Sequence, residues 1–186
     1  MKIILALFAI ALILTSCSQQ QARMPVTHSS GTFMKESIER NKILIAGEED
    51  KIDSIIKSDP NKKFIGSNKG YWYAYEKRNL VDTISPKKGD IAYFNYEVKD
   101  LDGNIIYSEL ELRPQEYYVD KEQKIMMGLR DGIKLMRKNE TVTFLFPSHM
   151  AYGYHGDDRR IGHNEPLLCV VTLNDFKSDP NPTGNN

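Results

Sequence analysis

The chain has 186 residues, a length typical of one domain with appendages. Hydrophobic residues make up 40% of it and charged residues 27%, which is enough apolar material for a packed core and excludes a wholly disordered chain. Lys and Arg together number 25, and Asp and Glu together also number 25. The chain therefore lacks the basic excess of a nucleic-acid binder that relies on phosphate contacts. The 2 cysteines are too few for a cysteine-based zinc site or a scaffold of several disulfides.

The N-terminus has the pattern of a secretory signal. Residues 3–14 are all apolar, a run too short to span a bilayer, which needs about 20 residues. The run ends in Leu14-Thr15-Ser16-Cys17, which resembles the cleavage site of bacterial lipoprotein signal peptidase. We therefore expect removal of residues 1–16 and lipidation of Cys17, since two or three acyl chains hold a protein stably on a membrane. The alternative is an ordinary signal peptide with a chance cysteine.

This pattern also predicts where the protein resides. A lipid on Cys17 implies the cell envelope, and Ser18 replaces the aspartate associated with inner-membrane retention in some bacteria. We expect an outer-membrane anchor with the protein facing the periplasm. Cys169 then has no disulfide partner, and its apolar surroundings in residues 167–171 predict a small buried side chain.

Residues 17–32 are polar and predict a flexible tether after the lipidated cysteine. Residues 33–83 predict a helical region and a leading strand. Ile38, Ile45 and Ile52 recur every seven residues, which is compatible with a coiled coil. Because the intermediate positions 41 and 48 are polar, a helix lying on its own domain or a short stalk is favoured. Gly47 could also divide the helix, which Asp59-Pro60 ends.

The remainder has the pattern of an antiparallel sheet. The expected strands are 71–75, 91–98, 105–107, 116–119, 140–146 and 167–176. A helix is expected at 127–138. Asp102-Gly103 predicts a hairpin between the second and third strands. Since helices and strands are segregated, the fold class is α+β. Residues 178–186 predict a disordered tail.

No covalent or metal-binding motif stands out, and we expect neither metal nor cofactor. His149, His155 and His163 share one loop at spacings too wide for a rigid metal site, and His28 lies in the tether. Residues 157–160 (Asp-Asp-Arg-Arg) predict a solvated charge cluster. No serine lies in a nucleophile elbow, and no glycine-rich loop precedes a helix.

One ordered set of residues resembles the FK506-binding protein (FKBP) family of peptidyl-prolyl isomerases. The matching residues are Pro86, Gly89, Asp90, Tyr96, Asp102, Gly103, Gly128, Gly132, Met136, Glu140, Ala151, Tyr152, Gly153 and Leu167. The resemblance covers about residues 84–176 and implies a domain at 84–177. It further implies an FKBP-like five-stranded antiparallel half-barrel wrapped on one short helix, with a proline pocket between them. With the signal and the N-terminal helix, the chain also resembles the gliding-motility-associated isomerase lipoproteins.

The resemblance also assigns roles to individual residues. Tyr96 and Tyr152 would be catalytic, with the Tyr152 hydroxyl pointing at a substrate carbonyl. Ile125 and Met126 would contact the peptide, and Ile161 would close the rim. The remaining substrate-binding positions are occupied by Ile106, Tyr107, Leu129 and Cys169.

Some of these positions depart from the family pattern. Ile106-Tyr107 replaces a Phe-Asp pair, so the family's carboxylate is missing there. Leu129 occupies the position of a tryptophan, and Cys169 that of an aromatic residue. The family's phenylalanine on the short middle strand falls among residues 116–118.

Two functions follow from the resemblance. The first is a peptidyl-prolyl cis-trans isomerase that assists the folding of envelope proteins, including gliding-motility components. The alternative is a catalytically weak FKBP scaffold that binds proline-containing or unfolded segments. In both cases the partners are proline-containing polypeptides and, through Cys17, the membrane.

Overall fold

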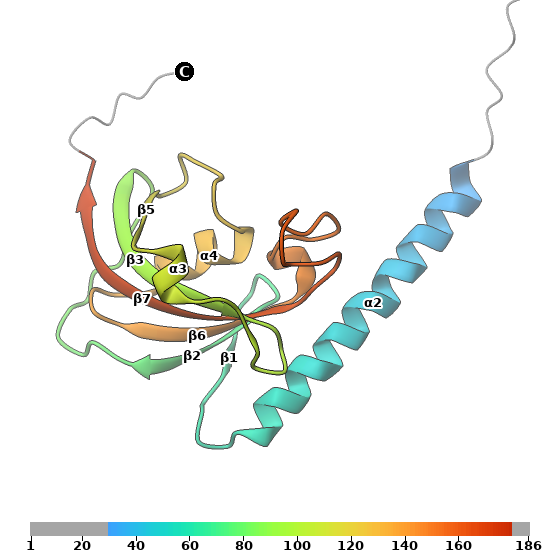
Figure 1. Cartoon of the computed structure of the whole chain (residues 1–186), viewed down its shortest axis with the longest axis horizontal. Coiled ribbons are helices and arrows are strands. Elements are labelled where there is room, and N and C mark those ends of the chain that lie inside the picture. The colour runs from blue at the N-terminus through green and yellow to red at the C-terminus, as the bar shows by residue number, and fades with distance from the viewer. Residues whose placement is uncertain (1–29, 180–186) are drawn as a thin grey trace, which may run out of the picture. The chain divides into compact units, whose positions relative to one another are not determined.

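The computed structural model describes residues 30–179. The predicted signal peptide, Cys17 and most of the tether lie outside these residues, as does nearly all of the predicted tail. The first described element is the helix α2 (Ser30–Ser58), and the sheet follows it in the chain (Figure 1). The chain divides into two units, of which the second, Glu39–Asn186, contains the C-terminal part of α2 and every described strand.

All strand pairs in the sheet are antiparallel, which confirms the predicted α+β class. The strands are β1 (Ile65–Gly66), β2 (Trp72–Lys77), β3 (Asp90–Lys99), β4 (Ile105–Tyr107), β5 (Gln115–Tyr118), β6 (Thr141–Phe146) and β7 (Leu167–Ser178). Their order is β1-β2-β6-β7-β3-β4, with β5 also paired to β3. Five of them lie within the predicted domain, and the leading strand β2 extends their sheet by pairing with β6. Figure 1 shows the curved sheet with α4 (Met127–Gly132) beside it.

Side-chain alternation defines the core face of β3. Ala92, Phe94, Tyr96 and Val98 are buried, and the residues between them are only partly buried. The hairpin to β4 forms at the predicted position, because Gly103 adopts a φ of +90° that favours glycine. In β6 both faces are buried from Val142 onwards, so its side chains do not alternate between core and solvent.

The helix predicted at 127–138 is shorter than expected. The α-helix α4 ends at Gly132, and one 3-10 turn, η1 (Ile133–Leu135), completes it. Met136 is already extended, and the Arg137 N–H donates to the Glu140 carboxylate at 2.8 Å instead of to a helical carbonyl. The other Glu140 oxygen accepts from the Asn79 N–H at 3.0 Å, so this buried carboxylate terminates the helix and holds the preceding loop.

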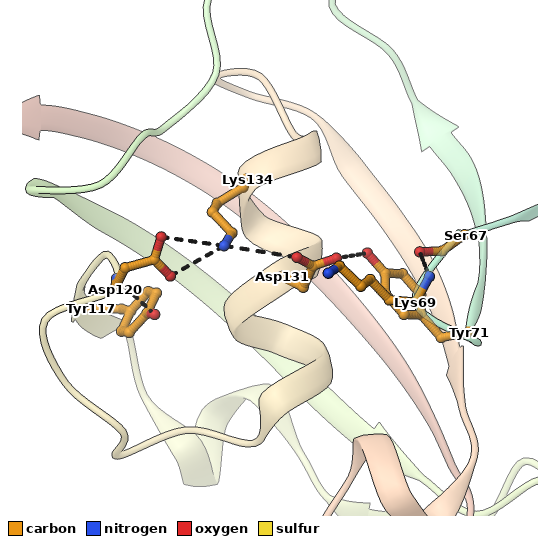
Figure 2. A network of polar contacts seen from close by, with 7 residues as sticks. All are labelled: Ser67, Lys69, Tyr71, Tyr117, Asp120, Asp131 and Lys134. Carbon is orange, nitrogen blue, oxygen red and sulfur yellow. Dashed lines mark hydrogen bonds and ion pairs between the residues drawn. The ribbon is translucent and has the colours of Figure 1, made fainter.

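A polar network connects α4 and η1 to residues just before β2 and just after β5 (Figure 2). The buried Tyr71, just before β2, donates its hydroxyl to Asp131 at 2.8 Å. Lys134 bridges Asp131 and Asp120, and the Asp120 N–H donates to the Tyr117 hydroxyl at 3.0 Å. The two ion pairs are partly exposed and contribute little by themselves. The Tyr71 bond satisfies a buried hydroxyl and so fixes the position of α4.

The helix α2 is continuous through Gly47, so the predicted break does not occur. Glu48 and Ile52 are buried, whereas Ile38 and Ile43 are more than half exposed. Of the alternatives considered for this helix, burial of Glu48 and Ile52 within the second unit supports the one in which the helix lies on its own domain. Within residues 30–179 no helix combines the length and apolar character needed to cross a membrane.

Candidate active site

Three tyrosines and a cysteine from four segments converge at one place. Tyr96 lies on β3, Tyr107 ends β4, Tyr152 follows the 3-10 turn η2 (Ser148–Met150), and Cys169 lies on β7 opposite Val98. Burial raises the pKa of Tyr96, and the proximity of Tyr152, Cys169 and Tyr107 raises it further. The structure therefore brings together both residues predicted to be catalytic and two of those predicted to bind substrate.

The remaining predicted residues divide into an interior group and a partly buried group. Leu129 and Cys169 have no exposed surface, and Met126 and Ile161 are at most 5% exposed. Ile106, Ile125 and Tyr152 are partly buried and pack against the same core. Leu129 and Cys169 thus belong to the closed interior behind the tyrosines.

Two hydroxyl groups at this place remain free to bind a ligand. Neither Tyr96 nor Tyr152 makes a hydrogen bond through its hydroxyl to another residue in the described part of the chain. Burial, followed by Cys169, Asp157 and Tyr107, raises the pKa of Tyr152 to about 12. The Tyr152 hydroxyl is therefore protonated at neutral pH and can donate to a carbonyl oxygen.

Asp157 is a charged residue of the site that the sequence pattern did not indicate. Its Oδ2 accepts a hydrogen bond from the Tyr107 hydroxyl, and its Oδ1 accepts from the backbone N–H groups of residues 159, 160 and 161 at 2.8–3.0 Å. Burial alone would raise the pKa of Asp157, but these hydrogen bonds lower it overall. A carboxylate is therefore present beside position 107, although it comes from a distant loop.

Arg160 closes the same arrangement from outside. Its guanidinium lies 4.9 Å from the centre of the Tyr107 ring, donates to the Ile106 carbonyl at 2.7 Å and pairs with both carboxylate oxygens of Glu111 at 2.6 and 3.0 Å. Glu111 belongs to α3 (Glu109–Leu112), a helix that the sequence analysis did not predict. The interpretation of residues 157–160 as a solvated charge cluster is therefore wrong for Asp157, whereas Arg160 is exposed as expected and is paired with Glu111.

A sequence signal for this loop exists in Gly156-Asp157. Gly156 has a φ of +70°, and a Cβ there would lie 2.2 Å from the Ile161 carbonyl oxygen, so only glycine fits. An aspartate that caps the N–H groups two to four residues later is typical of such turns. The partner Tyr107, 50 residues earlier, could not be inferred from that local pattern.

Two surface cavities lie away from these residues. One of about 470 Å³ is lined by residues of α2, the β3–β4 hairpin and the segment before β7, including Ile55, Leu101 and Pro166. The other, of about 280 Å³, adjoins the polar network of Figure 2 and includes Met127 and Arg130. Neither is lined by a residue predicted for the site. Within residues 30–179 no group of three or more His, Cys, Asp or Glu residues is arranged to hold a metal ion.

Comparison with known proteins identifies the family. The family model of FKBP-type peptidyl-prolyl cis-trans isomerases matches residues 82–174, half of the chain. The chain belongs to this family. The matched range contains β3 to β6, most of β7 and every predicted site residue except the lipidation site.

Two curated FKBP relatives illustrate the extent of the match. The probable FKBP-type isomerase FkpA of Neisseria meningitidis is 24% identical over 140 residues, which cover 74% of this chain and 50% of that protein. Human FKBP9 is 26% identical over 91 residues, covering 49% of this chain and 16% of that protein. The chain thus spans half or less of the length of these relatives.

Solved FKBP structures share the fold. FkpA from Escherichia coli superposes with a TM-score of 0.60 at 20% identity, over 94% of this chain and 82% of that one. A peptidyl-prolyl cis-trans isomerase from Pseudomonas syringae superposes with a TM-score of 0.58 at 17% identity, over 74% of this chain and 96% of that one. These likenesses establish the FKBP fold, with a short helix against an antiparallel sheet and a helix ahead of it.

Proposed function

We propose that this FKBP-family protein is a peptidyl-prolyl cis-trans isomerase that acts on proline-containing polypeptides. The observation that carries the proposal is the pair of unpartnered hydroxyls, those of Tyr96 and Tyr152, within a buried aromatic cluster of an FKBP domain. Rotation about an X-Pro bond faces a barrier of about 20 kcal/mol because amide resonance is lost. A preorganised donor in a largely apolar site stabilises the twisted amide without nucleophile, metal or cofactor.

Within this proposal Tyr152, Tyr107 and Asp157 have different roles. Tyr152 donates to a substrate carbonyl, because its hydroxyl is protonated and unpaired. Tyr107 does not, because its hydroxyl already donates to Asp157. Asp157 supplies a carboxylate beside Tyr107, the residue that the resemblance aligns with the family's acid.

The closed interior favours the alternative function, a binding module with little turnover. Leu129 and Cys169, at positions expected to contact a proline ring, have no exposed surface. A ligand that does not reach them has less contact area, and burial stabilises binding by only about 25 cal/mol per Å². Weak turnover with measurable peptide affinity would support this alternative.

The assay that decides between the two functions uses Tyr152→Phe, with Tyr154→Phe as the matched control. Tyr154 is two residues away and 68% exposed, so its hydroxyl is not part of the cluster. We expect Tyr152→Phe to lower kcat/KM on a short X-Pro peptide about tenfold to a hundredfold, equivalent to roughly 1–3 kcal/mol. The Tyr154→Phe protein should match the wild type.

A direct cis/trans assay gives both rates, and peptide titration gives the Kd of each protein. If the wild type binds the peptide without accelerating isomerisation, the binding-module function is correct. If Tyr152→Phe retains the wild-type rate, the catalytic donor is a different group.

We further propose that the protein works in the cell envelope, attached to the outer membrane through lipid on Cys17. The support is the sequence pattern of residues 3–17, with an apolar run that ends in Leu-Thr-Ser-Cys. Envelope proteins that fold in the periplasm, gliding-motility components among them, are the clients that this location offers.

A further inference from the structure

A buried carboxylate of the N-terminal helix contacts the turn that precedes Tyr152. Glu48 of α2 is 6% exposed. Its Oε2 accepts from the Ser148 N–H at 2.7 Å, and its Oε1 accepts from the Ser148 hydroxyl at 2.6 Å. Within residues 30–179 no Lys, Arg or His forms an ion pair with it. A buried carboxylate without a cation depends on such hydrogen bonds, so the contact with Ser148 holds this part of α2 in place.

The same serine continues the connection to the site. The Ser148 carbonyl accepts from the Ala151 N–H at 3.0 Å and from the Gly153 N–H at 2.8 Å. These two residues flank Tyr152 on either side. A continuous series of hydrogen bonds therefore runs from the Glu48 carboxylate, through the N–H, hydroxyl and carbonyl groups of Ser148, to the backbone on either side of Tyr152.

Two further backbone hydrogen bonds hold the residues beside Tyr152, from the Ala151 N–H to the Pro147 carbonyl at 3.2 Å and from the Asn164 N–H to the Gly153 carbonyl at 2.9 Å. Ala151 has φ −93° and ψ −120°, outside helix and strand, and Gly153 has φ +64°. Tyr152 lies in a turn, and its hydroxyl makes no hydrogen bond within residues 30–179. The position of Tyr152 therefore depends on its packing against the core and on its backbone, and the bonds to Ser148 contribute to holding that backbone.

We propose that Glu48 is a positioning residue for the isomerase site and that the part of α2 around it is therefore part of the functional unit. The inference rests on the proposed function, in which Tyr152 is the donor. It extends the site to a residue outside the family match at 82–174. Misplacement of a reacting group by about 1 Å lowers a rate by up to about a hundredfold, so a distant carboxylate of this kind can affect catalysis.

The test compares Glu48→Ala and Glu48→Gln with the matched control Glu49→Ala. Glu49 is the next residue on α2 and is exposed. We expect Glu48→Ala to lower kcat about tenfold or more with a smaller effect on KM. Glu48→Gln should recover part of the rate, because its amide oxygen still accepts from Ser148, and Glu49→Ala should equal the wild type.

Hydrogen exchange at the Ala151 and Gly153 amides provides a readout independent of activity. Faster exchange at both amides in Glu48→Ala, together with the lower kcat, supports the proposal. Unchanged exchange overturns the proposal. Faster exchange together with a kcat equal to that of the wild type also overturns it. If Glu48→Ala does not fold, Ser148→Ala serves instead, since it removes only the hydroxyl contact. A wild-type rate and wild-type exchange in that variant also overturn the proposal.

If the wild-type protein itself does not accelerate isomerisation, the proposed function fails separately. The positioning role is then judged on the Kd for the same proline peptide and on the exchange of the two amides. A weaker Kd with faster exchange in Glu48→Ala supports it, and an unchanged Kd overturns it.

Discussion

Tyr107, which the resemblance aligns with the family's aspartate, donates its hydroxyl to Asp157, which lies 50 residues later in the chain. Burial, then the hydrogen bond to Asp157, raises the pKa of Tyr107, so the phenol remains a donor at neutral pH. Arg160 covers the ring at 4.9 Å and pairs with Glu111. The substitution therefore moves the acid from β4 to a loop and ties that loop to the sheet.

A double-mutant cycle with Tyr107→Phe and Asp157→Asn measures this link. A hydrogen bond to a charged group contributes about 1.5–3 kcal/mol, so each single variant should be destabilised and the double variant should lose less than the sum. Urea denaturation of the four proteins gives the coupling energy. Additive effects would mean that the two side chains stabilise the fold independently.

The same variants predict a pH dependence. Because the pKa of Asp157 is lower when folded than its ordinary value, the contribution of its carboxylate is fully present above that value and is lost as the pH falls through the folded one. The stability difference between wild type and Asp157→Asn should stay constant from about pH 7 to pH 5 and shrink below about pH 4, near the ordinary aspartate pKa. A difference that shrinks near pH 6 instead would point to another titrating group.

Among the elements, α4 depends on small residues where it meets the sheet. A Cβ on Gly128 would lie 2.4 Å from the Phe146 ring and 2.9 Å from the Met150 carbonyl oxygen. A Cβ on Gly132 would likewise lie 2.7 Å from the Phe144 ring. The two glycines of the family motif therefore set how closely α4 approaches β6.

Gly128→Ala should destabilise the protein, and Gly47→Ala should not. The first introduces overpacking, which costs about 1–3 kcal/mol, because both the ring and the backbone must shift. Gly47 is exposed, and nothing lies within 4 Å of its added Cβ, so alanine should stabilise α2 by about 0.5–1 kcal/mol. Melting temperatures and denaturant midpoints of both variants check this. Equal stability of Gly128→Ala and wild type would show that α4 can move away from β6.

For the whole molecule, the main prediction concerns its attachment to the membrane. Cys17→Ser should abolish acylation and leave unprocessed precursor or a detached protein, because the thioether forms only on cysteine. Membrane fractionation and mass spectrometry of the N-terminal peptide in the native host check this. Normal fractionation of the variant with the membrane would contradict the lipoprotein interpretation.

Most of the strands and the N-terminal helix could be predicted from the sequence, whereas α3 and the early end of α4 could not. The strand at 91–98, the Asp102-Gly103 turn and the helix that ends at Asp59-Pro60 are local patterns, and the structure confirms each within a few residues. Burial of Cys169 was likewise predicted from its apolar neighbours. These features were predictable because backbone geometry and side-chain period act between residues close in the chain.

The contacts between distant residues became evident only in the folded chain. Glu48 was interpreted as a polar interruption of a helix seam, yet it is buried against Ser148, 100 residues away. Asp157 was interpreted as a solvated charge, yet it accepts from Tyr107. A polar side chain carries no local signal of whether folding will bring it a partner, because that depends on loop paths and on register across the sheet. For this reason the sequence indicated the tyrosines of the site, whereas the carboxylates that hold its loops emerged only from the fold.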